Sequence, residues 1–213
     1  MPRKTREEAM RTRQKLVDSA LDVMSQKPYS SVSMTEIAER IGYSKGAIYW
    51  HFLNKNALLV HVIENACLQF EKELAIDPAD ALSYDTVRAY FKRKMSKPFE
   101  NERFEKLQNL IVRRQEWPEE VQGKVMDIFK TRIDKETKMI EQILTKMQKE
   151  GSIRKELSAR NLATLITAMF HGMFVFSMKD VYGAEMDYEK YTDFIFDAFR
   201  KEMEPQEAKD EKK

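Results

Sequence analysis

A lysine and two small residues stand side by side at the start of the segment KGAIYWHF. Lys45 can donate hydrogen bonds to guanine O6 or N7, whereas Gly46 and Ala47 are small enough to let a backbone approach the edges of bases. Ala47 can also contact the methyl group of thymine. These residue types therefore suit the first turn of a helix that lies in a DNA major groove.

The side chains that follow can either hold phosphate groups or pack internally. Tyr49, His51 and Lys55 can donate to phosphate oxygens and so fix the register on a duplex without recognising its sequence. Core packing is the commoner fate of aromatic side chains on a short helix, so Tyr49 and Trp50 have two possible roles. We expect DNA contact for Tyr49; for Trp50 the core is favoured, but it is kept among the candidate contacts.

Two short predicted helices, 34–41 and 45–52, position these residues. The first has apolar side chains at i, i+3, i+4 and i+7, which are Met34, Ile37, Ala38 and Ile41. Ser33 and the glutamate three residues later form a capping box, Gly42 tolerates the left-handed backbone that ends a helix, and Ser44 can cap the second helix. Two short helices joined by a glycine-containing turn have the proportions of a helix-turn-helix.

Helical periodicity also extends along the rest of the chain. With only six glycines and six prolines in 213 residues, the composition favours long helices and an all-α fold. One helix is expected to end before Pro28, and a long one to begin at Lys55. The later helices are expected from about residue 84 with breaks near Pro98 and Pro118, over 121–150, from 158 to about 182, and from 187 to about 203.

Positive charge is concentrated at the start of the chain. The whole chain carries a formal net charge of +2, and the positive excess lies within residues 1–56. Arg3 and Lys4 begin a basic arm that could contact an acidic partner, most commonly nucleic acid, although such arms are often only solvated. The hydroxyls of Ser33 and Thr35 lie at a helix N-terminus, where they can face phosphate.

The stretch from Arg13 to about Glu64 resembles the DNA-binding domain of the TetR family of bacterial transcriptional regulators, and in particular its AcrR-like branch of multidrug-efflux repressors. The pattern G-x-S-x-G-A-I-Y-W-H-F-x-x-K matches from Gly42 to Lys55; Asn54 is a mild departure. The resemblance implies an N-terminal three-helix DNA-binding domain and a larger helical domain for ligand binding and dimerisation, about nine helices in all. The expected boundaries are 1–54, 55–203 and a disordered tail, 204–213.

Together, the residues and the resemblance define a set of candidate DNA contacts. They lie on the basic arm, at the starts of the two short helices, and along the second helix. They are Arg3, Lys4, Ser33, Thr35, Ser44, Lys45, Gly46, Ala47, Tyr49, Trp50, His51 and Lys55.

The segment 161–178 contains no charged residue, so it must be buried nearly all round. A membrane span is the competing interpretation, but polar residues interrupt the segment and the chain's mean hydropathy is −0.61. The resemblance implies a homodimer formed mainly by the last two helices. The candidate interface residues are Leu165, Met169, Met173, Phe176, Tyr191, Ile195 and Phe199.

The resemblance also implies a pocket for a small lipophilic inducer among the central helices. Each candidate can instead belong to the plain core, and His171 can have a structural hydrogen bond or orient a ligand. The candidates are Phe91, Phe104, Leu107, Ile111, Trp117, Phe129, Phe170, His171 and Phe174.

No P-loop, no H-E-x-x-H and no other clear metal spacing is present, so neither catalysis nor a cofactor or metal is expected. The single cysteine, Cys67, and the absence of an apolar leader in the first twenty residues favour a cytoplasmic protein without membrane association. The expected function is a ligand-responsive repressor that binds a palindromic DNA operator. The alternative is an architectural protein that coats DNA without sequence preference.

Overall fold

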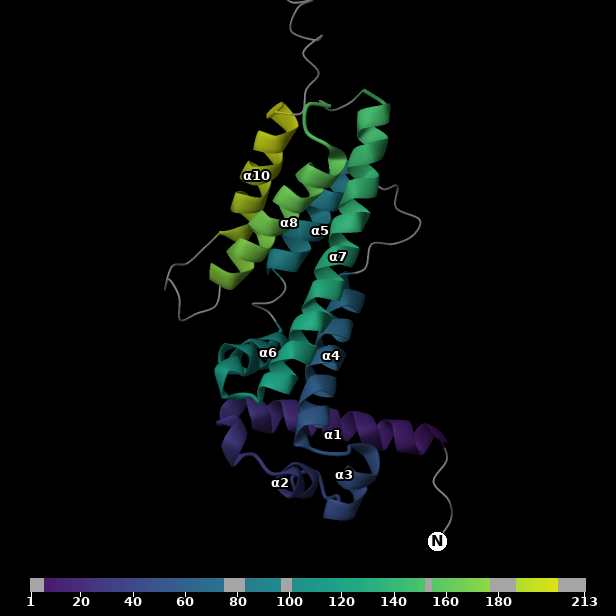
Figure 1. The fold of residues 1–213 in the computed structure, drawn as a ribbon, viewed down its shortest axis with the longest axis vertical. Coiled ribbons are helices and arrows are strands. Elements are labelled where there is room, and N and C mark those ends of the chain that lie inside the picture. Colours follow the sequence, from purple (N-terminus) through teal and green to yellow (C-terminus); the bar gives the residue numbers. More distant parts are fainter. Residues whose placement is uncertain (1–5, 75–82, 97–100, 152–154, 177–186, 203–213) are drawn as a thin grey trace, which may run out of the picture. The chain divides into compact units, whose positions relative to one another are not determined.

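The computed structural model describes residues 6–74, 83–96, 101–151, 155–176 and 187–202, and among these the side chains of 174–176 and 198–202 are not described (Figure 1). Within these ranges all regular elements are α-helices or short 3-10 turns, without a strand. The predicted all-α fold is confirmed.

The chain divides into two compact units. The first comprises Met1–Glu73 with Asn101–Phe129, and the second Leu74–Glu100 with Lys130–Lys213. This division follows packing and does not test the functional boundary expected near residue 54, which stays a prediction.

Most of the first unit is built from the N-terminal helices, joined by a later segment of the chain. Its elements are α1 (Arg6–Gln26), η1 (Tyr29–Ser31), α2 (Met34–Glu39), α3 (Lys45–His51), α4 (Lys55–Leu74), α6 (Glu102–Val112), η3 (Arg114–Glu116) and the start of α7 (Glu119–Lys149). The breaks predicted before Pro28, near Pro118 and at about Gly151 are confirmed, and the one near Pro98 lies outside the described residues.

The predicted start and stop signals place α2 and α3. The side-chain oxygen of Ser33 accepts a hydrogen bond from the backbone N–H of Glu36 at 3.1 Å, and that of Ser44 from Ala47 at 3.3 Å. Gly42 has φ +74°, which an L-residue with a Cβ atom adopts only with strain. The Glu36 carboxylate pairs with the ammonium of Lys27 at 2.6 Å, which lowers its pKa. One half of the predicted capping box is therefore present, and Glu36 ties α2 to the end of α1.

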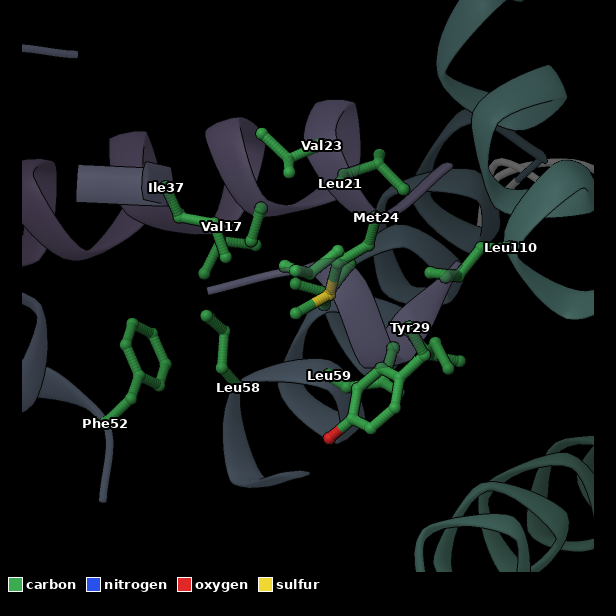
Figure 2. Packing of buried hydrophobic residues seen from close by; sticks show 14 of the residues in the cluster. Val17, Leu21, Val23, Met24, Tyr29, Ile37, Phe52, Leu58, Leu59 and Leu110 are labelled. Carbon is green, nitrogen blue, oxygen red and sulfur yellow. The ribbon is translucent and has the colours of Figure 1, made fainter. Parts of the chain in front are cut away.

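A continuous apolar core holds the short helices in place (Figure 2). Ile48 is the buried side chain of α3, and Phe52, which caps its C-terminus, is buried beside it. They join a cluster that includes Met24, Leu58 and Leu59. Burial of each such side chain contributes roughly 1.5–3 kcal/mol, which a seven-residue helix needs because it is not stable alone.

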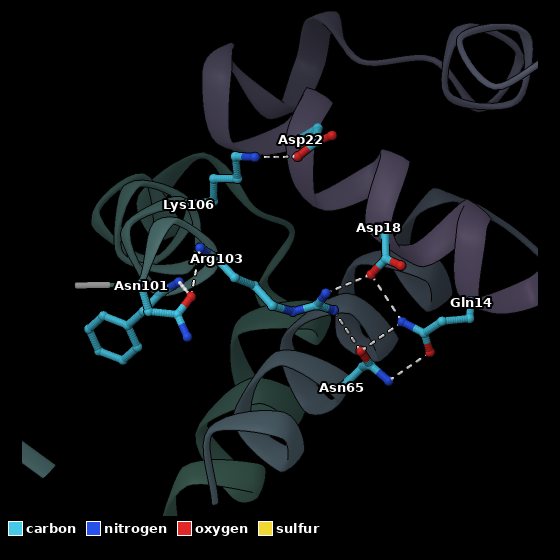
Figure 3. A network of polar contacts seen from close by, with 8 residues as sticks. Gln14, Asp18, Asp22, Asn65, Asn101, Arg103 and Lys106 are labelled. Atoms are coloured by element: carbon cyan, nitrogen blue, oxygen red, sulfur yellow. Dashed lines mark hydrogen bonds and ion pairs between the residues drawn. The ribbon is translucent and has the colours of Figure 1, made fainter. Parts of the chain in front are cut away.

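Polar contacts connect α6 to α1 and α4 (Figure 3). The Arg103 guanidinium donates to Asp18 at 2.7 Å and to the Asn65 side-chain oxygen at 2.9 Å. The Lys106 ammonium lies 2.7 Å from an oxygen of Asp22, and this hydrogen bond raises the pKa of Lys106. These partly exposed pairs contribute geometry more than energy, about 0–1 kcal/mol each.

Arg13 of α1 connects the end of α3 to α4. Its Nη1 donates to His61 Nε2 at 2.8 Å, and its guanidinium carbon lies 4.9 Å from the centre of the Phe52 ring. Because arginine has no acceptor, Nε2 must accept, so the proton of neutral His61 is on Nδ1, 3.8 Å from Glu64. Burial and the nearby Arg13 charge lower the pKa of His61.

The second unit contains α5 (Tyr84–Ser96), α8 (Ala159–Phe176), α10 (Tyr188–Glu202) and the C-terminal part of α7. The rings of Phe91 and Phe170 stack with centroids 4.0 Å apart, and both approach Phe196. Arg88 on α5 donates to Asp193 on α10 at 2.7 Å. None of the helices described has the length and apolarity needed to cross a membrane.

The left-handed turn between α2 and α3 can be tested with two glycines. Gly42→Ala should lower the free energy of unfolding by about 1 kcal/mol, because a Cβ atom is strained at positive φ. Gly123→Ala, within α7, should raise it by about 0.5–1 kcal/mol, since alanine favours the helix. An added Cβ meets nothing within 4 Å at either position, so crowding does not complicate the comparison. Equal effects in urea denaturation would contradict this account of Gly42.

The Arg13–His61 contact predicts that stability falls with acidification. The folded pKa of His61 lies below its unfolded value near 6.5, so protons bind the unfolded chain first as the pH falls below that value. The free energy of unfolding should therefore decrease as the pH falls from about 6.5 to the folded pKa. The contribution of His61 to this decrease should be absent in His61→Gln. Any dependence of the unfolding free energy on pH that remains in this variant is expected to come from His171. Burial and the nearby Lys94 charge also lower the pKa of His171. Urea denaturation at several pH values measures this dependence. If His61→Gln loses as much stability on acidification as the parent protein, the assignment to His61 is wrong.

Candidate nucleic-acid interface

The polar edge of α3 faces solvent. Lys45 and Gly46 are exposed, Ala47 is half-buried, and 48% of Tyr49 is accessible. Ile48, on the opposite side, is fully buried. The buried side chain fixes the rotation of α3, and the residues predicted to contact bases and phosphates are left outward.

The side chains of Lys45 and Tyr49 lie close to each other on α3. The Lys45 ammonium lies 5.9 Å from the centre of the Tyr49 ring, which is within the range of a weak cation–π contact. Such a contact keeps the lysine above the helix surface. Lys45 and Tyr49 thus lie on the same exposed side of α3, and their contacts with DNA stay a prediction.

Trp50 is exposed rather than packed in the core. Its accessible fraction is 73%, and its ring meets the edge of His51 with centroids 4.5 Å apart. The core role that the sequence favoured for Trp50 is therefore wrong. His51 is half-buried between this ring and that of Phe52.

Leu53, which the sequence analysis did not single out, extends this surface. It is 83% exposed directly after α3, although a leucine is ordinarily a buried residue. From the sequence, its exposure could have been predicted only from its position in the break between α3 and α4. An apolar side chain here can contact deoxyribose or a thymine methyl group.

The other predicted DNA contacts lie around α2 or outside the described residues. Ser33 is exposed at the N-cap of α2, Thr35 is half-buried in its first turn, and Ser44 is exposed at the N-cap of α3. Both capping oxygens accept a hydrogen bond from a backbone N–H group. Each hydroxyl can still donate a hydrogen bond toward solvent. Arg3 and Lys4 lie outside the described residues.

Lys55 departs from its predicted role as a phosphate ligand. Its ammonium donates to the carbonyl oxygens of Tyr29 at 2.7 Å and Val32 at 2.9 Å. It also lies 4.2 Å from the centre of the Tyr29 ring, and burial lowers its pKa. Lys55 thus holds the η1 turn against α4, and its charge is engaged inside the first unit.

The predicted pocket residues are divided between the cores of the two units. Leu107 and Trp117 are buried in the first core, Ile111 and Phe129 pack against it, and Phe104 contacts Phe70 on α4 with centroids 4.9 Å apart. Phe91 and Phe170 stack in the second core. As described, these side chains fill cores, so a pocket formed by them stays a prediction.

His171 takes part in a buried polar cluster of the second unit. Its Nε2 lies 3.2 Å from Glu136, whose other oxygen accepts from Lys94 at 2.5 Å and from Tyr90 at 2.8 Å. The Glu136 side chain is only 8% exposed, so Lys94 and Tyr90 are needed as donors to compensate its desolvation. Among the described residues His171 Nε2 is buried without a hydrogen-bond partner, so the structural role expected for His171 stays a prediction. The side chain of Phe174 is not described.

The predicted dimer residues separate into an exposed and a buried group. Leu165, Met169 and Tyr191 are exposed, as an interface requires, and Phe194, one turn after Tyr191 on α10, is 73% accessible. Ile195 belongs to the core instead, because it lies about 100° around α10 from Phe194, on the buried side of the helix. Met173 also packs against this core. The side chains of Phe176 and Phe199 are not described.

An open groove of about 440 Å³ lies between α4, the end of α3 and the start of α7. Charged and polar side chains supply much of its lining, among them Arg13, His61, Glu64 and Lys124. It therefore does not match an apolar pocket for a lipophilic ligand. Within the described ranges, no cluster of three or more histidine, cysteine or acidic residues could hold a metal ion.

The N-terminal part of the chain is similar to known bacterial regulatory proteins. Residues 16–62 match the model of "Bacterial regulatory proteins, tetR family". The chain is 48% identical over 64 residues to the transcriptional regulator AcrR of Shigella flexneri, covering 30% of each protein. It is 34% identical over 87 residues to the regulator SrpR of Pseudomonas putida, covering 41% of each. These matches therefore span less than half of either relative.

The fold is shared over a greater length. NalD, described as the secondary repressor of the MexAB-OprM multidrug efflux pump in Pseudomonas aeruginosa, superposes with a TM-score of 0.71 at 18% identity, covering 94% of this chain and 100% of NalD. SmeT, in a complex with triclosan, gives 0.72 at 21% identity, covering 92% and 93%. The relatives are transcriptional regulators, which agrees with the expectation that this chain is not an enzyme. Residues 16–62 therefore carry the N-terminal domain of the tetR family of bacterial regulatory proteins, and the fold of the whole chain is similar to that of NalD and SmeT.

Proposed function

We propose that this protein is a sequence-specific DNA-binding repressor, released from a palindromic operator by a small lipophilic inducer. The observation that best supports this proposal is the exposed side of α3. Lys45, Gly46 and Tyr49 face solvent there, and Ile48 on the other side of the helix is buried in the core. A base-contacting helix needs this combination, because its exposed face must be polar and its position must be fixed by the core.

Recognition combines base contacts with phosphate contacts. Lys45 donates to guanine in the major groove, and Ala47 lies within the same first turn of α3. Tyr49, Trp50 and the hydroxyls of Ser33 and Ser44 hold the flanking phosphates and sugars. Lys55 is left out of this set, because its ammonium is bonded to the η1 turn.

A homodimer places two such helices on one duplex. The second unit has exposed apolar side chains one turn apart on two helices, Leu165 and Met169 on α8 and Tyr191 and Phe194 on α10, and these four residues are called the apolar patch. Soluble proteins rarely leave such a cluster uncovered, and a second copy of the same chain can cover it with its own patch. Two-fold symmetry requires an operator with half-sites about 34–36 Å apart.

The inducer acts through the helices that follow α3. Solved structures of the same fold include a complex of SmeT with triclosan, a small lipophilic compound, which supports the ligand class. A ligand that fits one arrangement of the helices better than the other shifts α4, and with it α3. The inducer can change the free energy of DNA binding only by the difference between its binding free energies for the two arrangements, typically about 1–3 kcal/mol.

Selection of bound sequences from random DNA tests the proposal, repeated with a panel of lipophilic compounds. Recovery of one approximately palindromic sequence, and its release by at least one compound, is the expected result. Recovery of unrelated sequences with equal affinity would instead indicate the architectural protein that coats DNA.

Lys45→Ala should reduce sequence discrimination. Loss of a base contact is expected to cost about 1–3 kcal/mol on the selected operator and almost nothing on random DNA. Lys72→Ala, an exposed lysine in the last turn of α4, is the charge-matched control and should bind as the parent does. Fluorescence anisotropy at fixed salt measures both affinities. Unchanged discrimination in Lys45→Ala would exclude its base-contacting role.

Phe194→Ser should weaken the dimer. The exposed ring is the largest apolar side chain of the patch, and its loss is expected to raise the dimer dissociation constant by roughly tenfold or more. Leu157→Ser, an exposed apolar residue ahead of α8, serves as the control. Sedimentation equilibrium measures the constants; equal values for both variants would place the interface elsewhere.

A further inference from the structure

We infer that Glu116 in η3 is a positioning residue for DNA recognition, which holds the η1 turn and thereby sets the orientation of α2 and α3. The Glu116 carboxylate accepts a hydrogen bond from the backbone N–H of Tyr29 at 2.9 Å, across 87 positions of sequence. The inference rests on the proposed function, which it extends to a specific contact made from outside the matched segment 16–62.

Each polar group of Tyr29 is bonded to a later part of the chain. The N–H donates to Glu116, the carbonyl oxygen accepts from Lys55, and the hydroxyl donates to the side chain of Asn56. The ring also faces the Lys55 ammonium. Two of the three partners belong to α4, and Glu116 alone of the three belongs to η3. The η1 turn is therefore held from two sides.

The η1 turn controls where α2 begins. Only Val32 and the N-cap Ser33 separate η1 from α2, and Val32 is buried with its carbonyl oxygen bonded to Lys55. The Lys27–Glu36 pair also spans this turn. A displacement of η1 therefore passes to α2, and through the short turn at Gly42 to α3.

Glu116 is itself fixed by its neighbours. Trp117, the next residue, is buried in the core of the first unit, and its carbonyl oxygen accepts from Gln122 at 2.9 Å. On the other side, α6 is bonded to α1 through Arg103 and Lys106. The carboxylate thus follows the position of the α6–η3 segment, so a shift of that segment alters the η1 turn.

The test uses the 213-residue chain and three variants of it. Glu116→Ala removes the acceptor, whereas Glu116→Gln keeps a carbonyl oxygen that can accept from Tyr29. Glu119→Ala removes the same charge from an exposed position in the first turn of α7. Hydrogen exchange of the Tyr29 amide reports the contact without DNA, and affinities for selected and random DNA report recognition. Thermal unfolding confirms that each variant is folded.

Glu116→Ala is expected to exchange the Tyr29 amide at least about tenfold faster and to lose roughly five- to tenfold in affinity for the selected operator, with unchanged binding to random DNA. Glu116→Gln should largely restore both readouts, and Glu119→Ala should match the parent. A general loss of stability would lower both DNA affinities together, and that result would overturn the positioning role.

Other outcomes also decide between the claims. Unchanged exchange in Glu116→Ala would refute the contact, and faster exchange with intact discrimination would refute its role in recognition. If the parent protein selects no DNA sequence, the proposed function fails and the inference about recognition fails with it, while the exchange data still establish whether the contact exists.

Discussion

Burial of Ile48 is the interaction on which the rest of this structure depends. A helix of seven residues has almost no stability of its own, so α3 exists because its buried side chain and the adjacent Phe52 join the core formed by α1 and α4. The same burial fixes the rotation of α3 about its axis. Lys45, Tyr49 and Trp50 consequently face solvent, and a different rotation would place them against apolar neighbours.

Polar contacts supply the geometry that an apolar core cannot specify. Side-chain caps at Ser33 and Ser44 fix where α2 and α3 begin, and Gly42 provides the left-handed turn between them. The η1 turn is in turn held by Lys55 and Glu116, which satisfy backbone groups that would otherwise need water. The helix-turn-helix is thus oriented in part by Lys55 and Glu116, which are not among the proposed DNA contacts.

Local features of the fold could be predicted from the sequence, because they depend on neighbouring residues. Both serine caps, the glycine turn and the apolar spacing of α2 involve residues no more than a few positions apart. The partners of long polar side chains could not be predicted. Lys55 was expected to bind phosphate but bonds to carbonyl groups 23 and 26 positions earlier, and Glu116 reaches Tyr29 across 87 positions. Trp50 was misplaced because exposure of an aromatic ring depends on the rotation of a helix, and the pocket aromatics could not be assigned because core and ligand contacts require the same residue types.

Hydroxyl-radical footprinting of the parent protein on its selected DNA tests the central claim most directly, since it maps where the exposed edges of two α3 helices meet one duplex. The account predicts two protected half-sites related by two-fold symmetry, with centres about one helical turn apart. Continuous protection without a boundary, or a single protected half-site at saturating protein, would contradict it.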